Sequence, residues 1–263
     1  VQENEGLVGV ALPALVEVGE RVDIQHNSGL QSVELPLLAT TGGRLRVWDN
    51  DALAMIDLPS LTSVQTLLDI RANPAAATLF APKLTTVKGS VEISSNGLTT
   101  LDLPALTAVD TFFSLMNNER IEWFSLPALQ TVGDDSNWDH GFEVKDNPSL
   151  TWFSAPALTS LLASLTISAN DALAWFDLSS LTLLRKLAIA SNPELASMLL
   201  MSLGEVSNSF YVASNAKLAQ CLVDLLIGQV QASTGILGSI TTSDNHEACT
   251  CVLVGDGVVA DCQ

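Results

Sequence analysis

The chain has 263 residues, of which 48% are hydrophobic and only 5% aromatic, so its core must consist mainly of aliphatic side chains. Eleven Lys and Arg against 29 Asp and Glu give a net charge of −18. This charge argues against a nucleic-acid or anionic-membrane surface, because both need clustered cations. No apolar run reaches the ~18 residues of a transmembrane helix, so we expect a chain that does not span a membrane.

A repeat runs through most of the chain. Asn recurs at intervals of 22 or 23 residues, broken once by an interval of 29, at positions 27, 50, 73, 96, 118, 147, 170, 192 and 215. The unit reads L-P-x-L-x-x-V-x-x-x-L-x-I-x-x-N-x-x-L-x-x-L-x-L-P. One such coil cannot bury its own apolar face, so the repeat predicts a solenoid in which neighbouring coils stack.

Within each unit the apolar residues alternate, as Leu68 and Ile70 do, which predicts a short half-buried strand before the Asn. A second strand follows the Asn, as at residues 101–103, and Pro ends it because it has no N–H for a ladder. We therefore expect a mainly β fold, a right-handed parallel β-solenoid of about nine to ten coils. The Asn is expected to be structural: it tolerates left-handed backbone, and its amide satisfies buried turn groups.

The end of the chain is predicted to differ from the repeats. Residues 1–217 form the repeat solenoid, and residues 218–263 form a C-terminal cap within the same structural domain. The cap begins with helical spacing at Leu218–Ile227 and continues with a last strand at Ser239–Ser243. A hairpin is expected over residues 252–261. The helix would cover the open core of the last coil.

All four cysteines lie in this cap. Cys249 and Cys251 are too close to bridge comfortably, and Cys251 and Cys262 are equidistant from the predicted hairpin turn. We therefore expect the disulfides Cys251–Cys262 and Cys221–Cys249. The alternative is a metal site at His246-x-x-Cys249-x-Cys251, which lacks the usual C-x-x-C spacing. Disulfides favour a secreted, periplasmic or cell-surface protein.

The pattern V-x-x-x-L-x-I-x-x-N-x-x-L-x-x-L resembles the leucine-rich repeats of the L domains of epidermal-growth-factor and insulin receptors, which also resemble repeats in fungal wall and bacterial surface proteins. The resemblance extends over roughly residues 7–250. It implies a solenoid that binds polypeptides through variable outward residues. It transfers no individual binding position to this chain.

One candidate site is the six-residue insertion that produces the longer interval. Residues 133–141 supply Asp134, Asp135, Asn137, Trp138 and Asp139. Asp135-x-Asn137-x-Asp139 has the oxygen spacing that opens a calcium loop, but the glycine is misplaced and no Glu stands at the twelfth position. A solvated acidic loop is therefore preferred to a calcium site. We interpret Trp138 as a partner contact or as a lid over the neighbouring coil.

A second candidate is a column formed by Trp123, Trp152 and Trp175, each five residues after its Asn. Strand alternation turns this column outward, so the indoles should stack one coil apart, at about 4.8 Å. Such a stripe suits protein contacts or sugar-ring stacking. The alternative is that each Trp packs along its neighbours and is half buried.

A third candidate is the outward face of the strand before the Asn, which changes along the chain from charged residues such as Asp23, Arg46 and Asp69 to small ones. No motif of phosphate binding, acyl transfer or metalloproteolysis occurs, so we expect no enzyme and no required cofactor. The favoured function is protein recognition through outward residues and the inserted loop, with glycan binding by the Trp column as the alternative. Adsorption to ice or to a mineral surface is a third hypothesis, which rests on Thr62, Thr85, Thr107, Thr159 and Thr182.

Overall fold

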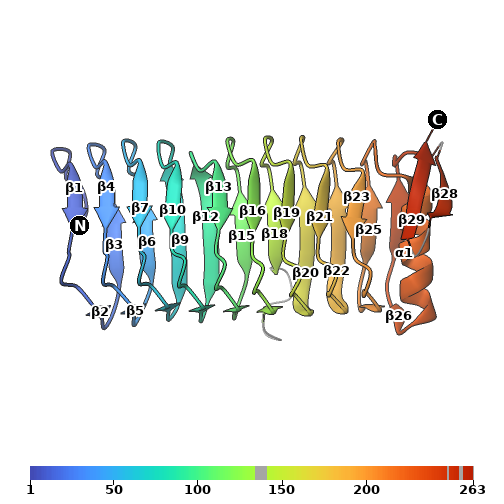
Figure 1. Ribbon diagram of the computed structural model, residues 1–263, viewed down its shortest axis with the longest axis horizontal. Helices are drawn as coiled ribbons and strands as arrows, with labels where there is room; N and C mark the ends of the chain where they lie inside the picture. Colours follow the sequence, from blue (N-terminus) through green and yellow to red (C-terminus); the bar gives the residue numbers. More distant parts are fainter. Residues whose placement is uncertain (134–140, 248, 255–256, 263) are drawn as a thin grey trace.

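The chain folds into a parallel β-solenoid of about nine coils, confirming the predicted fold class. The computed structural model describes residues 1–133, 141–247, 249–254 and 257–262, and describes residues 249–250, 252–254 and 257–262 by their backbone alone. The coils stack along the long axis of the molecule, with the two termini at opposite ends (Figure 1). Successive coils pair in parallel, as β3 and β6 do, and the register shifts within the pair of β20 and β22 at a bulge between Leu161 and Ser164.

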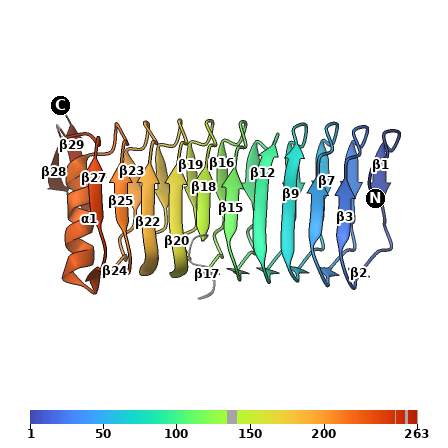
Figure 2. The ribbon, with the colours of Figure 1, turned by 180° about the vertical axis from the view of Figure 1, so that it is seen from behind.

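Each coil contributes up to three strand segments. The long segment before the Asn forms one wall, where the strands lie side by side (Figure 2). These strands are β3 (Val22–Gln25), β6 (Leu45–Trp48), β9 (Leu67–Asn73), β12 (Ser90–Asn96), β15 (Phe113–Met116), β18 (Phe142–Lys145), β20 (Ser160–Ser168), β22 (Leu183–Ala190), β25 (Phe210–Ala213) and β27 (Ile240–Ser243).

A two-residue segment precedes most of these strands and belongs to the same sheet, which the sequence pattern did not predict. The two segments merge in β20 and β22. The separate ones are β2 (Glu17–Val18), β5 (Thr40–Thr41), β8 (Ser63–Val64), β11 (Thr86–Val87), β14 (Ala108–Val109), β17 (Thr131–Val132), β24 (Glu205–Val206) and β26 (Gly235–Ile236).

The segment after the Asn forms the opposite wall, as two sheets. The first contains β1 (Gly9–Ala11), β4 (Ser32–Glu34), β7 (Met55–Asp57) and β10 (Thr78–Phe80). The second contains β13 (Thr100–Asp102), β16 (Trp123–Ser125), β19 (Trp152–Ser154), β21 (Trp175–Asp177) and β23 (Ser197–Leu199). The wall is interrupted at the 22-residue interval after Asn96, where the turn is one residue shorter. Gly97 permits that turn, because a Cβ there would lie 2.2 Å from the carbonyl oxygen of Pro74.

The core consists of the inward residues of both walls. Ile70 and Ile93 are 0% exposed, as the alternating pattern predicted. Phenylalanines fill the middle coils, where the rings of Phe124 and Phe153 stack with centroids 4.7 Å apart. Each fully buried side chain of this size contributes about 1.5–3 kcal/mol. Because every coil meets only its neighbours, the core is continuous along the axis but local in its contacts.

Among the described residues, the recurring Asn forms a hydrogen-bonded ladder of eleven members, from Asn4 in the first turn to Asn245 in the cap. The Oδ1 atom of Asn73 accepts from the backbone N–H and from the Nδ2 of Asn50. Its own Nδ2 donates to the carbonyl of Val47 in the preceding coil. The predicted structural role of the amide is therefore confirmed.

The left-handed backbone of these turns lies one residue before the position that the sequence suggested. The residue preceding each ladder Asn has φ between 51° and 58°, as His26, Asp49 and Ala72 do. Left-handed backbone costs a non-glycine residue about 1 kcal/mol or more. Since this conformation directs the Asn amide into the core corner, the hydrogen bonds of the ladder offset that cost.

The C-terminal cap contains the predicted helix, α1 (Gln220–Ala232), which starts two residues later and ends five residues later than expected. It replaces the strand after the Asn in the last coil and covers the core with Val223, Leu226 and Val230, all buried. The long-strand wall continues beside it through β27. An antiparallel hairpin follows, of β28 (Cys249–Val254) and β29 (Gly257–Cys262).

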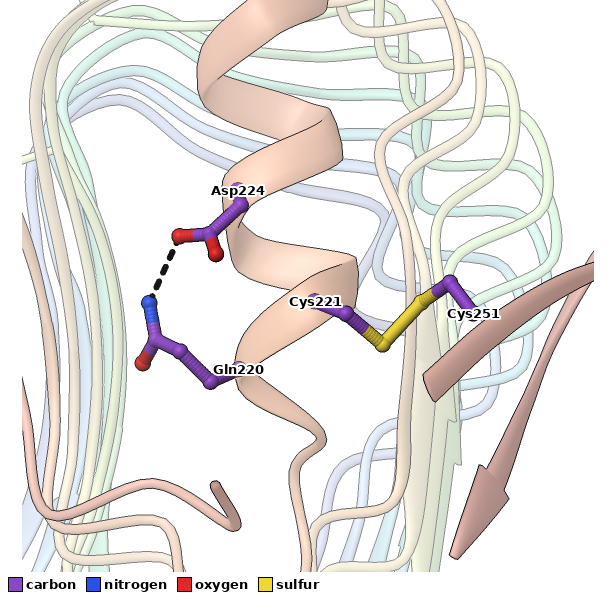
Figure 3. The surroundings of a disulfide bond; sticks show 4 residues. All are labelled: Gln220, Cys221, Asp224 and Cys251. Atoms are coloured by element: carbon purple, nitrogen blue, oxygen red, sulfur yellow. Dashed lines mark hydrogen bonds between the residues drawn. A yellow bond between two sulfur atoms is a disulfide. The ribbon is translucent and has the colours of Figure 1, made fainter. Parts of the chain in front are cut away.

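The predicted disulfide pairing is wrong. Cys221 of α1 is bonded to Cys251 of β28 (Figure 3), which excludes both Cys251–Cys262 and Cys221–Cys249. The error lies in the hairpin register. The last backbone pair before the turn is Val254 with Gly257. Pairing Cys251 with Cys262 would need a turn centred one residue later in the sequence. Cys251 therefore lies opposite Ala260 in the backbone.

Candidate functional site

The three tryptophans of the predicted column stack on one another along β16, β19 and β21 and are here called the Trp ridge. Figure 1 shows where these three strands lie in the solenoid. The strands hold Trp123, Trp152 and Trp175 in direct register. Successive ring centroids lie 5.3 and 5.2 Å apart, with ring planes within 2° of parallel. Trp123 and Trp152 are half-buried, and Trp175 is 38% exposed. The stacking prediction is confirmed. The indoles are partly exposed, as expected of an outward column, and partly buried against their neighbours, as the alternative interpretation expected.

The stacked geometry decides which part of each indole a ligand can reach. Both faces of Trp152 are covered by its neighbours, so its exposed surface is the rim of the ring. The rim carries the positive edge of the aromatic quadrupole and the indole N–H donor. Open faces exist only at the ends of the ridge, where Trp123 adjoins Thr100 and Trp175 adjoins Ser197. The ridge therefore presents ring edges along its length and flat ring faces only at its two ends.

The opposite wall carries a network of ion pairs in its first coils. Asp23 accepts hydrogen bonds from Arg44 at 2.7 and 3.1 Å and contacts Arg21 at 3.1 Å. The hydrogen bond from Arg44 holds the pKa of Asp23 below its ordinary value, against the effect of burial. The same hydrogen bond raises the pKa of Arg44. These charges satisfy one another, as expected of a stabilised ladder.

Asp69 and Trp48 form the centre of this network. Asp69 is 0% exposed and lies 2.6 Å from the Nε of Arg46 and 2.5 Å from that of Arg71. Both guanidinium groups also lie over the Trp48 ring, 5.7 and 5.8 Å from its centroid. The arginines are thus held between a buried carboxylate and an aromatic ring, which fixes their positions in the wall.

The threonine column has a role within the fold. The hydroxyls of Thr62, Thr85, Thr107, Thr159 and Thr182 each donate to a backbone carbonyl of the preceding coil, at 2.9 to 3.3 Å. This donation stabilises the turn between coils. It also leaves the hydroxyl oxygens, but not their protons, for other partners.

An apolar groove lies between the last strand of the second sheet and the cap helix. It has a volume of about 940 Å³, and its described walls come from Ser197–Met201, the α1 side chains from Cys221 to Gln229, and Cys251. Met201 is 64% exposed and Leu225 is 47% exposed. The groove begins one coil beyond Trp175, because Ser197 is the register partner of that residue.

Several predicted positions lie outside the described residues. These are Asp134, Asp135, Asn137, Trp138 and Asp139, with the calcium hypothesis that rests on them. The alternative metal site in the cap loses a ligand, because Cys251 is bonded to Cys221. Elsewhere in the described part of the chain, no group of three His, Cys, Asp or Glu side chains is close enough to hold a metal.

Comparison of the chain with protein-family models, with curated proteins and with solved structures gives no match. Within the described residues, no helix combines the length and the apolar character needed to cross a membrane.

The sequence interpretation missed the groove and the Trp48 cluster. Exposed apolar residues at Met201 and Leu225 were visible in the sequence, but only the packing of α1 against the last coil makes them line one groove. The alternation of Arg46 and Trp48 with inward residues did place both on one face, so that cluster had a signal in the sequence.

Proposed function

We propose that this protein is a non-enzymatic binding module that recognises a protein partner through the Trp ridge. The observation that carries the proposal is the edge-outward stack of Trp123, Trp152 and Trp175. Tryptophan is enriched among the residues that dominate binding energy in protein interfaces. Strands on both sides fix these indoles, so a partner gains contact area without having to order flexible side chains.

The rim geometry supports a protein partner over a glycan. Sugar recognition by stacking needs an open aromatic face, and Trp152 has none. A row of indole rims instead suits the carbonyl and carboxylate oxygens of a polypeptide surface. The resemblance of the repeat to receptor L domains favours the same partner class. Glycan binding remains the second candidate, restricted to the end faces of Trp123 and Trp175.

We further propose that the protein functions in an oxidising compartment, as a secreted, periplasmic or cell-surface protein. The support is the Cys221–Cys251 disulfide between helix and hairpin. Disulfides persist in such compartments and are rare in reducing ones. The inserted loop at residues 133–141 follows the coil of Trp123, so it is proposed as a second contact for the same partner.

The test uses labelled wild-type protein on an array of extracellular proteins and on a glycan array. Trp152→Thr is compared with Met55→Thr, because Met55 is 39% exposed and occupies the same outward column four coils earlier. We expect a protein ligand whose affinity falls at least about tenfold, or ~1.4 kcal/mol, in Trp152→Thr only. Binding that both variants retain would contradict the proposal. A glycan ligand that Trp175→Thr loses and Met55→Thr retains would establish the second candidate.

A further inference from the structure

The groove beside α1 exposes the free edge of a sheet. Among the described strands, β23 pairs only with β21 and is the last strand of its sheet. In the next coil α1 replaces the strand that follows the Asn, and the groove separates this helix from β23. Gln229 of this helix donates to the carbonyls of Leu200 and Leu203 at 3.2 and 2.8 Å, which satisfies the turn that follows β23. No hydrogen bond from the described residues covers the free edge of β23 itself.

The register shows which backbone groups remain free. The N–H of Ser197 donates to Ala174, and the carbonyl of Leu199 accepts from Leu178. In a parallel pair, alternate residues direct both backbone groups to the same neighbour. Ser197 and Leu199 are therefore committed to β21, while the N–H and C=O of Met198 point toward the groove, which Met198 lines. An unpaired strand edge of this kind is a template for another strand.

We propose that this groove binds an extended segment of a partner protein, which adds as a strand to β23. Main-chain hydrogen bonds to Met198 would align the segment, and alternate side chains would enter the apolar groove between β23 and α1. Leu222 and Leu225 form the helical wall that these side chains would contact. The length of β23 limits the pairing to about three to five residues, or roughly 10–17 Å of extended chain.

The charge of the site specifies the partner further. Asp224 is the one charged side chain among the described residues that line the groove, and it is exposed. Its hydrogen-bond partner is the neutral amide of Gln220, at 2.8 Å (Figure 3). A Lys or Arg next to the apolar residues of the segment would pair with Asp224. The net charge of −18 adds attraction for a basic segment at long range.

The inference rests on the proposed protein-binding function, but its test does not use the Trp ridge. The probe is a fluorescent synthetic peptide that alternates Val and Thr and carries Lys at each end. A second peptide has N-methylated backbone at alternate residues and therefore lacks donors along one edge. Binding is followed by fluorescence anisotropy, and protection of the Met198 amide is followed by hydrogen exchange.

Four variants locate the peptide. Met198→Pro removes the free N–H at an edge position where proline is tolerated. Leu225→Lys places a charge in the helical wall, and Leu237→Lys is its matched control, because Leu237 is 67% exposed and lies outside the groove. Circular dichroism confirms that each variant is folded. Trp123→Ser, at the far end of the ridge, separates this proposal from the previous one.

We expect the unmethylated peptide to bind, to protect the Met198 amide, and to lose at least about tenfold in affinity in Met198→Pro and in Leu225→Lys. Leu237→Lys and Trp123→Ser should bind it as the wild type does. Absence of binding at millimolar peptide would overturn the proposal. So would equal binding of the methylated peptide, or binding that Leu225→Lys does not weaken.

Discussion

The Asn ladder and the Trp ridge both result from the parallel register of the coils, but they have different roles. In both, the parallel register places identical side chains one coil apart. The ladder runs from Asn4 to Asn245, and its interior members are 0–4% exposed. The ridge extends over three coils only, and Trp175 is 38% exposed. Other coils fill the ridge position with small or flexible residues.

This contrast distinguishes a residue that every coil requires, the Asn, from a residue that the coil only tolerates, the Trp. Every coil needs the Asn, because each interior amide satisfies backbone groups of the preceding coil, and most also satisfy a carbonyl of their own coil. No coil needs the Trp, since Ser32 and Thr100 occupy the equivalent strand position without disrupting the sheet. A bulky, half-exposed residue at a position that the fold leaves free is the basis for assigning the ridge to binding.

The largest effect should follow the loss of a ladder residue. Asn118→Ala removes an acceptor for the N–H and the Nδ2 of Asn96 and a donor to the carbonyls of Ile93 and Met116. At about 1 kcal/mol for each buried group, we expect a loss of about 4 kcal/mol in the free energy of unfolding, measured by urea denaturation. The exposed neighbour Glu119→Ala is the control and should change it by less than ~0.5 kcal/mol. A loss below about 1 kcal/mol in Asn118→Ala would mean that the ladder is dispensable.

A smaller effect should follow the loss of the disulfide. Cys221→Ser removes a cross-link between residues 30 positions apart, which stabilises by about 3 kcal/mol. Because coils contact only their neighbours, we expect hydrogen exchange to accelerate in α1 and to stay unchanged in β6 and β9. Reduction of the wild type should reproduce this pattern. Acceleration along the whole solenoid would show that the cap and the coils unfold as one unit.

The ion pairs of the charged wall should contribute least, below about 1 kcal/mol. The pKa of Asp23 is lowered in the folded protein by the hydrogen bond from Arg44. Its stabilisation is therefore full above the unfolded pKa of 3.8 and is lost as pH falls through the folded pKa. Unfolding measured from about pH 6 to about pH 2 should show wild type and Asp23→Asn converging at the acid end. A difference in the free energy of unfolding between wild type and Asp23→Asn that stays constant over this range would contradict the contribution of the Asp23–Arg44 pair.

The sequence contains most of the fold because one signal is repeated in every coil. Alternating pairs such as Leu68 and Ile70, together with the spaced Asn, fix strands, coil length and parallel stacking. The same register placed Trp152 against its neighbours. Features that occur once have no such redundancy. The disulfide of Cys251 depended on a one-residue difference in hairpin register, which no repeat constrained.

In the candidate site, too, the features that repeat could be predicted and those that occur once could not. The ridge follows from the repeat, whereas its half-buried, edge-outward geometry follows from side-chain packing that the repeat does not specify. The groove depends on how α1 sits against β23, a contact between one helix and one strand. A tertiary contact that occurs once produces no repeating pattern in the sequence. Met198 and Leu225 therefore appeared there as two unrelated apolar residues.

The central claim is that the fold needs the Asn ladder for its stability and does not need the Trp ridge. Asn170 and Trp175 test it within one coil, five residues apart. The measurement is the free energy of unfolding of Asn170→Ala and Trp175→Thr against the wild type. We predict a loss of at least about 3 kcal/mol for Asn170→Ala, from its buried hydrogen bonds. For Trp175→Thr we predict no more than about 1 kcal/mol, from one lost aromatic stack. Equal losses in the two variants would contradict the claim, because the indole would then be as structural as the amide.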